Sequence, residues 1–256
     1  MHKSAHPSKA LCISGAAVGI AIIVILRILS PQYTGNDTHN TIIDTIISRC
    51  VAAAIFALLI ANLGHKVFSA DMRCIWLTIP CLAVAINNMP IISLFRGDAY
   101  ISDSWTWIGL FALQCVAVAV YEEIAFRGVL LMLILGRRKG KKAAFEAVIV
   151  SSAVFALFHL LNLLDGAGIG QTIMQVGYSF LVGGMCAVLM LICGSIYPSI
   201  LVHATYNFCG YIVPTLGGGT WWDTPTIIIT AVLAVFTAVT VTVTLYKKAD
   251  FIMINQ

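Results

Sequence analysis

Long apolar stretches separated by short polar segments make up most of this chain of 256 residues. A helix needs about 20 apolar residues to cross the hydrocarbon core of a bilayer. Stretches of this kind recur along the whole chain and predict an all-α, polytopic membrane protein with eight transmembrane helices. The predicted spans lie at about 10–30, 46–64, 74–95, 105–135, 143–164, 171–193, 196–213 and 225–246.

The composition supports this class, because 60% of the residues are hydrophobic and only 10% are charged. Such a balance lies far outside the range of soluble globular domains. The eight cysteines are scattered singly, without a disulfide or metal-binding spacing, and are expected to pack as small apolar residues. No internal repeat or separate soluble segment is visible, so residues 1–256 are predicted to form a single membrane domain.

The basic residues predict the orientation in the membrane. If both termini lie in the cytoplasm, eleven of the fifteen Lys and Arg residues fall on the cytoplasmic side, as the positive-inside rule requires. These are Lys3, Lys9, Lys66, Arg73, Arg137, Arg138, Lys139, Lys141, Lys142, Lys247 and Lys248. The net charge of +4 therefore reflects topology, so lipid is an expected partner and nucleic acid is not. The short chain favours a bacterial cytoplasmic membrane.

The fourth predicted span carries three ionisable residues, Glu122, Glu123 and Arg127. Ionisable groups inside a bilayer are costly unless they pair or line a cavity. Glu123 and Arg127 are four residues apart and share a helix face, where they can form an ion pair. Glu122 points in another direction, which leaves one carboxylate for general-base chemistry.

Two further spans carry polar residues at similar depth. His159 lies in an otherwise apolar fifth span, and His203 and Asn207 stand four apart in the seventh. At about 1.5 Å of rise per residue, these residues and Glu122 lie roughly 10–20 Å from the predicted cytoplasmic ends of their helices. We expect them to meet in one polar cavity that opens toward the cytoplasm.

In these residues the chain resembles a known family. Glu122-Glu123-x-x-x-Arg127, Phe155-x-x-x-His159 and His203-x-x-x-Asn207 occur in this order in three separate helices. They are similar to the three motifs of the CAAX-protease and bacteriocin-processing intramembrane proteases, also called the type II CAAX prenyl endopeptidase or Abi family. The resemblance covers about residues 120–212, and it implies a protease-like region at about 105–213.

The resemblance implies a role for each motif residue. Glu122 and His159 match the pair that activates a water, His203 and Asn207 match the pair that holds the oxyanion, and Glu123 and Arg127 match a supporting charge pair. The family is usually described as metalloproteases, although a metal-free mechanism has also been argued for it. A divalent metal such as zinc therefore stays open as a cofactor, with His159, His203 and Glu122 as ligands, and so does a site without metal.

Three functions follow from these observations. The first is an intramembrane endopeptidase that cleaves near the cytoplasmic membrane face, acting on a CAAX-type protein, a leader peptide or a bacteriocin precursor. The second is a non-catalytic bacteriocin self-immunity factor or membrane scaffold with the same architecture. The third is a proton-coupled transporter, because intramembrane Glu and His residues also form proton relays. A peptide or membrane-associated protein is the partner expected for the first function.

Overall fold

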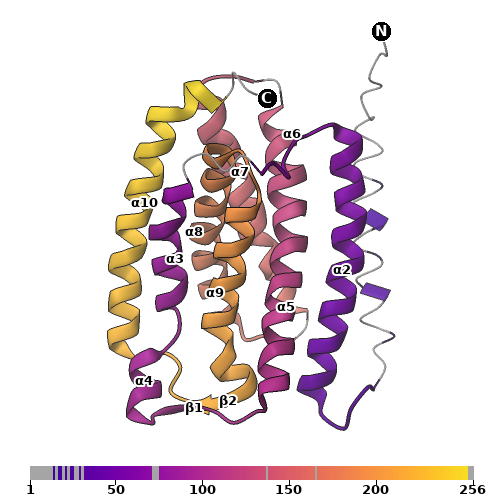
Figure 1. Ribbon diagram of the computed structural model, residues 1–256, viewed down its shortest axis with the longest axis vertical. Helices are drawn as coiled ribbons and strands as arrows, with labels where there is room; N and C mark the ends of the chain where they lie inside the picture. Colours follow the sequence, from indigo (N-terminus) through magenta and orange to yellow (C-terminus); the bar gives the residue numbers. More distant parts are fainter. Residues whose placement is uncertain are drawn as a thin grey trace.

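In the computed structural model of the protein, the described residues are 32–70, 75–136, 138–164 and 166–252, with isolated positions between 14 and 29. They form an elongated bundle of helices (Figure 1). The longer helices are α2 (Asp37–Leu63), α3 (Thr78–Asn87), α5 (Trp105–Glu123), α7 (Lys141–Phe158), α8 (Ile169–Cys193), α9 (Tyr197–Leu216) and α10 (Thr224–Ile252). The shorter elements are η1 (Ile75–Leu77), α4 (Ile91–Arg96), β1 (Ala99–Ile101), η2 (Ile124–Leu131), α6 (Met132–Leu135), η3 (His159–Leu163) and β2 (Gly217–Gly219).

The long helices run alternately up and down, so the bundle has two distinct ends (Figure 1). One end, drawn at the bottom, holds β1 and β2 and is called the ribbon end. The other is called the basic end, because it carries the described cations Lys66, Arg138, Lys139, Lys141, Lys142, Lys247 and Lys248.

Four described helical segments are long and apolar enough to cross a membrane, which supports an integral membrane protein. They are Asp37–Leu63, Lys141–Leu163, Ile169–Cys193 and Thr224–Lys248. Together with the almost complete absence of sheet from the described residues, they confirm the predicted all-α membrane class. The count of eight spans stays a prediction, and the span at 10–30 falls almost wholly outside the described residues.

Two predicted spans differ from the helices observed. The span predicted at 46–64 begins earlier, at Asp37, because the Asn36 side chain accepts a hydrogen bond from the His39 backbone N–H and caps the helix. The span predicted at 74–95 is not one helix. It breaks after Asn87, and α4 starts directly after Pro90, which cannot donate a backbone hydrogen bond within a helix.

The span predicted at 105–135 is continuous, but its middle is not α-helical. Element η2 is a π-helix that begins one residue after Glu123 and contains Arg127. Stretches of π-helix are rare and occur often at functional sites, because the wider turn changes the direction of the side chains. The apolar pattern of this segment gave no sign of the π-helix.

A short antiparallel ribbon of β1 and β2 was also missed by the sequence analysis. Ala99 pairs with Gly219 and Ile101 with Gly217. Gly219 has a φ of 93°, and a Cβ there would collide with the Asp98 carbonyl oxygen. The glycines at 217–219 thus permit a close backbone pairing.

Candidate active site

An ion pair anchors the candidate site in the bundle core. Arg127 Nη1 lies 3.0 Å from Glu123 Oε1, and the two side chains are 1% and 0% exposed. Arg127 Nη2 also donates a hydrogen bond of 3.1 Å to the Gly183 carbonyl in α8. The pair predicted from the spacing in the sequence is therefore present, and it links η2 to α8.

Aromatic and glycine packing holds the Arg127 guanidinium in place. Its Cζ lies 4.4 Å from the centroid of the Phe155 ring, a cation–π contact with α7. On the opposite helix, Gly183 leaves little room, because a Cβ there would lie 3.0 Å from Phe155 Cδ1 and 3.2 Å from Arg127 Nη2. Gly183 therefore allows α8 to approach the charged pair closely.

This packing predicts that Gly183→Ala destabilises the protein. The added methyl group must displace Arg127 or Phe155, and overpacking of this kind typically costs about 1–3 kcal/mol. Gly184→Ala is the matched control, since the nearest atom to a Cβ there is Ser152 Oγ at 3.9 Å. Thermal unfolding in detergent should show a lower midpoint for Gly183→Ala only. Equal midpoints for the two variants would contradict the tight contact.

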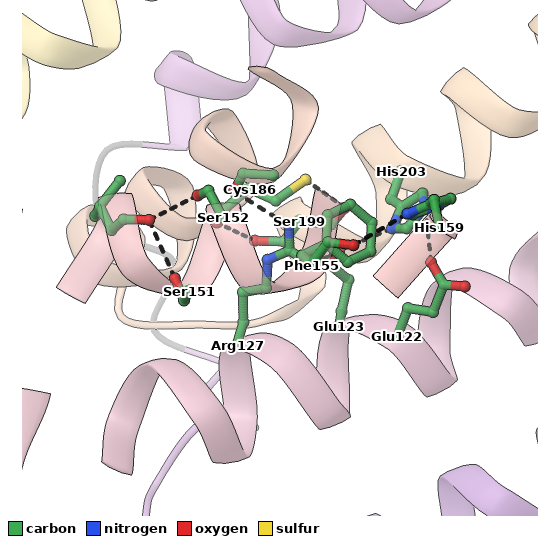
Figure 2. A network of polar contacts seen from close by, with 12 residues as sticks. Glu122, Glu123, Arg127, Ser151, Ser152, Phe155, His159, Cys186, Ser199 and His203 are labelled. Carbon is green, nitrogen blue, oxygen red and sulfur yellow. Dashed lines mark hydrogen bonds and ion pairs between the residues drawn. The ribbon is translucent and has the colours of Figure 1, made fainter. Parts of the chain in front are cut away.

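His203 joins the charged pair to the second glutamate (Figure 2). His203 Nδ1 lies 2.8 Å from Glu123 Oε1, and Nε2 lies 3.5 Å from Glu122 Oε2. Since a carboxylate accepts, Nδ1 carries a proton and donates to Glu123. Nε2 is thus the nitrogen that faces Glu122. The contact between Glu123 and His203 was missed by the sequence analysis, which had assigned Glu123 to Arg127 alone.

His159 has a fixed ring orientation. It lies directly after α7, and its Nδ1 is 3.0 Å from the Phe155 carbonyl oxygen, to which it donates. A neutral imidazole with a proton on Nδ1 has its lone pair on Nε2. The Phe155 ring packs edge-on against His159 and His203, with centroids 5.0 and 5.7 Å apart. Phe155 therefore positions both histidines as well as Arg127.

A cavity of about 520 Å³ lies beside these residues. Its wall contains Glu122, His159, His203 and Asn207, so four of the residues singled out from the sequence border one space. The Glu122 side chain is 13% exposed, whereas the Glu123 side chain is fully buried. The other lining residues are Thr38, Thr41, Ile42, Phe111, Gln114, Cys115, Val118, Phe155, Asn162, Gln175, Tyr178, Ser179, Val182, Tyr206, Tyr211, Pro214 and Thr215.

The lining of this cavity extends along the bundle from Glu122. Its lining includes Thr38 at the start of α2, Phe111 in the first half of α5 and Thr215 near the end of α9. These positions lie toward the ribbon end (Figure 1). The sequence predicted an opening toward the cytoplasm, and that opening stays a prediction.

The rim of the cavity at the ribbon end is braced. His39 Nε2 lies 2.7 Å from Asp103 Oδ2, and the His39 ring stacks on Trp107 with centroids 3.5 Å apart. The hydrogen bond with His39 lowers the pKa of Asp103 below its usual value. These contacts tie the start of α2 to the start of α5, beside the lining residues Thr38 and Thr41.

The polar residues do not form an evident metal centre. Among the described residues, no group of three or more His, Cys, Asp or Glu side chains is placed to hold a metal ion. The ligand set considered from the sequence, His159, His203 and Glu122, is therefore not gathered as a zinc site requires. His203 is instead engaged by Glu123 through Nδ1 and faces Glu122 through Nε2.

Comparison with known proteins bears directly on this site. Residues 104–209 match the family model of the type II CAAX prenyl endopeptidases, Rce1-like. The match confirms the resemblance inferred from the motifs and includes every motif residue from Glu122 to Asn207. At the family level it supports a CAAX-type intramembrane protease. Comparison with curated proteins and with solved structures gave no significant match.

Proposed function

We propose that this protein is an intramembrane endopeptidase that hydrolyses a peptide bond in the cavity beside Glu122. The observation that carries the proposal is the row of polar groups Glu122, His203 and Glu123, held at 3.5 and 2.8 Å inside an apolar bundle. Residues of this kind, buried beside a cavity, are typical of sites for proton transfer. The Rce1-like match over the same residues supports hydrolysis of a peptide bond.

Glu122 is the proposed general base. Its carboxylate borders the cavity, so a water bound there can give it a proton while the water oxygen attacks the substrate carbonyl. The same proton then passes to the leaving amine when the tetrahedral intermediate collapses. His159 is proposed to hold the water, because its Nε2 accepts a hydrogen bond when Nδ1 donates to the Phe155 carbonyl.

His203 and Asn207 are the proposed oxyanion donors. A protonated Nε2 of His203 can donate to the oxyanion, and the Asn207 amide lies one helical turn away in the same cavity wall. Glu123 orients the His203 ring through the hydrogen bond of 2.8 Å that it accepts from Nδ1. Arg127 in turn balances the second negative charge in the core.

The proposed substrate is a peptide or a membrane-associated protein, and the proposed setting is a bacterial cytoplasmic membrane with both termini in the cytoplasm. A direct test uses the purified protein in liposomes with a mixture of internally quenched peptides, and mass spectrometry of the products. Cleavage that is present in the wild type and absent in Glu122→Gln supports the proposal. Peptide binding without cleavage by the wild type would favour an immunity or scaffold function.

We propose further that the reaction proceeds without tightly bound zinc. The expected result is well under one zinc per chain in active, purified protein, because the candidate ligands are not gathered in a metal-binding group. Elemental analysis together with a cleavage assay checks this. Stoichiometric zinc, with activity lost on stripping and restored on adding the metal back, would overturn it and make His159 and His203 ligands.

A further inference from the structure

A second hollow, here called the α10 groove, lies along the outermost helix α10 (Figure 1). It has a volume of about 530 Å³ and is lined mainly by side chains of α7, α8 and α10. Its floor is apolar and buried, as Val188 and Leu245 illustrate. Its rim is apolar and open, because Ile149 and Leu181 are 54% and 51% exposed. The groove therefore opens on the outer surface of the bundle.

The shape and depth of the α10 groove suit a hydrocarbon chain. The helices that line it belong to the segments long and apolar enough to cross a membrane, so its open rim faces lipid. Small side chains of α10 leave it hollow, among them Ala234 and Ala238. From Ala234 to Leu245 the groove follows eleven residues, or about 16 Å of helix. This is about half of the roughly 30 Å hydrocarbon core, the depth of one leaflet.

Lysines continue the lining of the α10 groove at the basic end of the bundle. Lys141 stands four residues before the lining residue Phe145, so the two share a face of α7. Lys248 follows Leu245 by three residues and extends the lining face of α10 in the same way. Lys141 Nζ lies 4.0 Å from the centroid of the Tyr246 ring, which brings the start of α7 beside the end of α10.

The charge at this end of the groove is strongly positive. The described cations near the start of α7 and the end of α10 are Arg138, Lys139, Lys141, Lys142, Lys247 and Lys248. Among the side chains described there, Glu146 is the acidic one, and it already pairs with Arg138 at 2.8 Å. Basic residues at a membrane surface attract anionic headgroups, and lysine binds phosphate as a point charge. The positive-inside rule accounts for the cations, but not for an apolar groove that ends beside them.

From these observations we propose that the α10 groove binds an anionic phospholipid. The phosphate lies at Lys141 and Lys142, and one acyl chain lies between α8 and α10, along Val188 and Leu245. The lipid fills the space that α10 leaves against α7 and α8, so its binding stabilises the folded bundle by mass action. The proposal does not depend on the proposed function, because neither part of the lipid is held by Glu122 or its partners.

Lipid-dependent thermal unfolding tests the proposal. Delipidated protein in detergent is titrated with phosphatidylglycerol or with phosphatidylcholine of the same acyl chains. Lys142→Gln removes a cation that is 91% exposed, and Ala238→Leu fills the groove seven residues, or about 10 Å, before Leu245. Lys66→Gln and Ala54→Leu are the matched controls. They make the same changes at exposed positions after and within α2, on the side of the bundle opposite α10 (Figure 1).

The expected result is a higher unfolding midpoint with phosphatidylglycerol and no such rise with phosphatidylcholine. Lys142→Gln should need about fivefold more phosphatidylglycerol for the same rise, the usual effect of one lysine at a membrane surface. Ala238→Leu should lose most of the rise, and both controls should respond like the wild type. The proposal is overturned by an equal rise with both lipids, by no rise with either, or by an equal effect of Lys66→Gln and Lys142→Gln.

Crosslinking of the wild type gives a second measurement that needs no variant. Phosphatidylglycerol with a photoactivatable diazirine on one acyl chain is added to the purified protein, and tandem mass spectrometry assigns the crosslinked residues. The crosslinks should fall on the lining residues of α7, α8 and α10, such as Phe145, Val188 and Ala238. Crosslinks spread evenly over the exposed faces of all the helices would show ordinary surrounding lipid and would refute a site in the groove.

Discussion

Glu122→Gln is expected to reduce peptide hydrolysis by about 10²–10⁴-fold, the usual contribution of a positioned general base. The substitution removes the ability to accept a proton but leaves the volume of the side chain nearly unchanged. Because Glu122 borders the cavity and is 13% exposed, its loss should not open a hole in the core. The folded bundle and its thermal stability should therefore be retained.

The matched control for Glu122→Gln is Glu146→Gln in α7. Glu146 forms a surface ion pair with Arg138, in which both side chains are nearly half exposed. This variant makes the same chemical change far from the cavity and should cleave at the wild-type rate. Single-turnover kinetics on one cleaved peptide, with substrate binding measured separately, give the comparison. Full activity in purified Glu122→Gln would exclude this residue as the base.

The helix that carries Glu122 was predicted well, and its internal geometry was not. The bounds 105–135 agree with the structure because the apolar run from Trp105 to Leu135 ends in Gly136 and a group of cations. The π-helix from Ile124 to Leu131 leaves no mark in such a run. A π-helix has one more residue in each hydrogen-bonded turn than an α-helix. Whether such a turn forms depends on the packing of neighbouring helices, which a single sequence does not describe.

The partners of the site residues were predicted only where they lie in one helix. Glu123 and Arg127 are four residues apart, so the spacing indicated their contact directly. The contact between Glu123 and His203 joins positions 80 residues apart in α5 and α9. Gly183 carries no charge that would draw attention to it, and Phe155 was noted only for its spacing from His159, yet both contact the Arg127 guanidinium. Such contacts can be predicted only when it is known which helices pack against each other.

The packing around the site was beyond the sequence for a similar reason. The rise of a helix gave the depth of Glu122 and His203 in the membrane, but not how the helices pack on either side of them. Ile60 and Ile196 approach Gly128, where a Cβ would collide with Ile60. These residues are apolar like most of the chain, so only their contacts distinguish them.

Arg127→Ala should destabilise the folded protein by about 3–5 kcal/mol, the usual effect of removing one member of a buried ion pair. The change leaves Glu123 fully buried beside His203 without its cation, removes the hydrogen bond to Gly183 and empties the space over Phe155. Glu123→Gln should be milder, because the amide oxygen still accepts from Arg127 or His203.

Arg138→Ala is the matched control for Arg127→Ala, because it breaks an ion pair whose side chains are 49% and 44% exposed. Such pairs contribute only about 0–1 kcal/mol. Thermal unfolding in detergent is measured, and the yield of monodisperse protein is its readout. The two arginine variants should therefore differ clearly. If Arg127→Ala kept wild-type stability and lost only activity, the guanidinium would be needed for the reaction itself. Arg127 lies 3.0 Å from Glu123, and Glu123 accepts a hydrogen bond from His203. Through this chain of contacts, Arg127 would then act on the oxyanion donor His203.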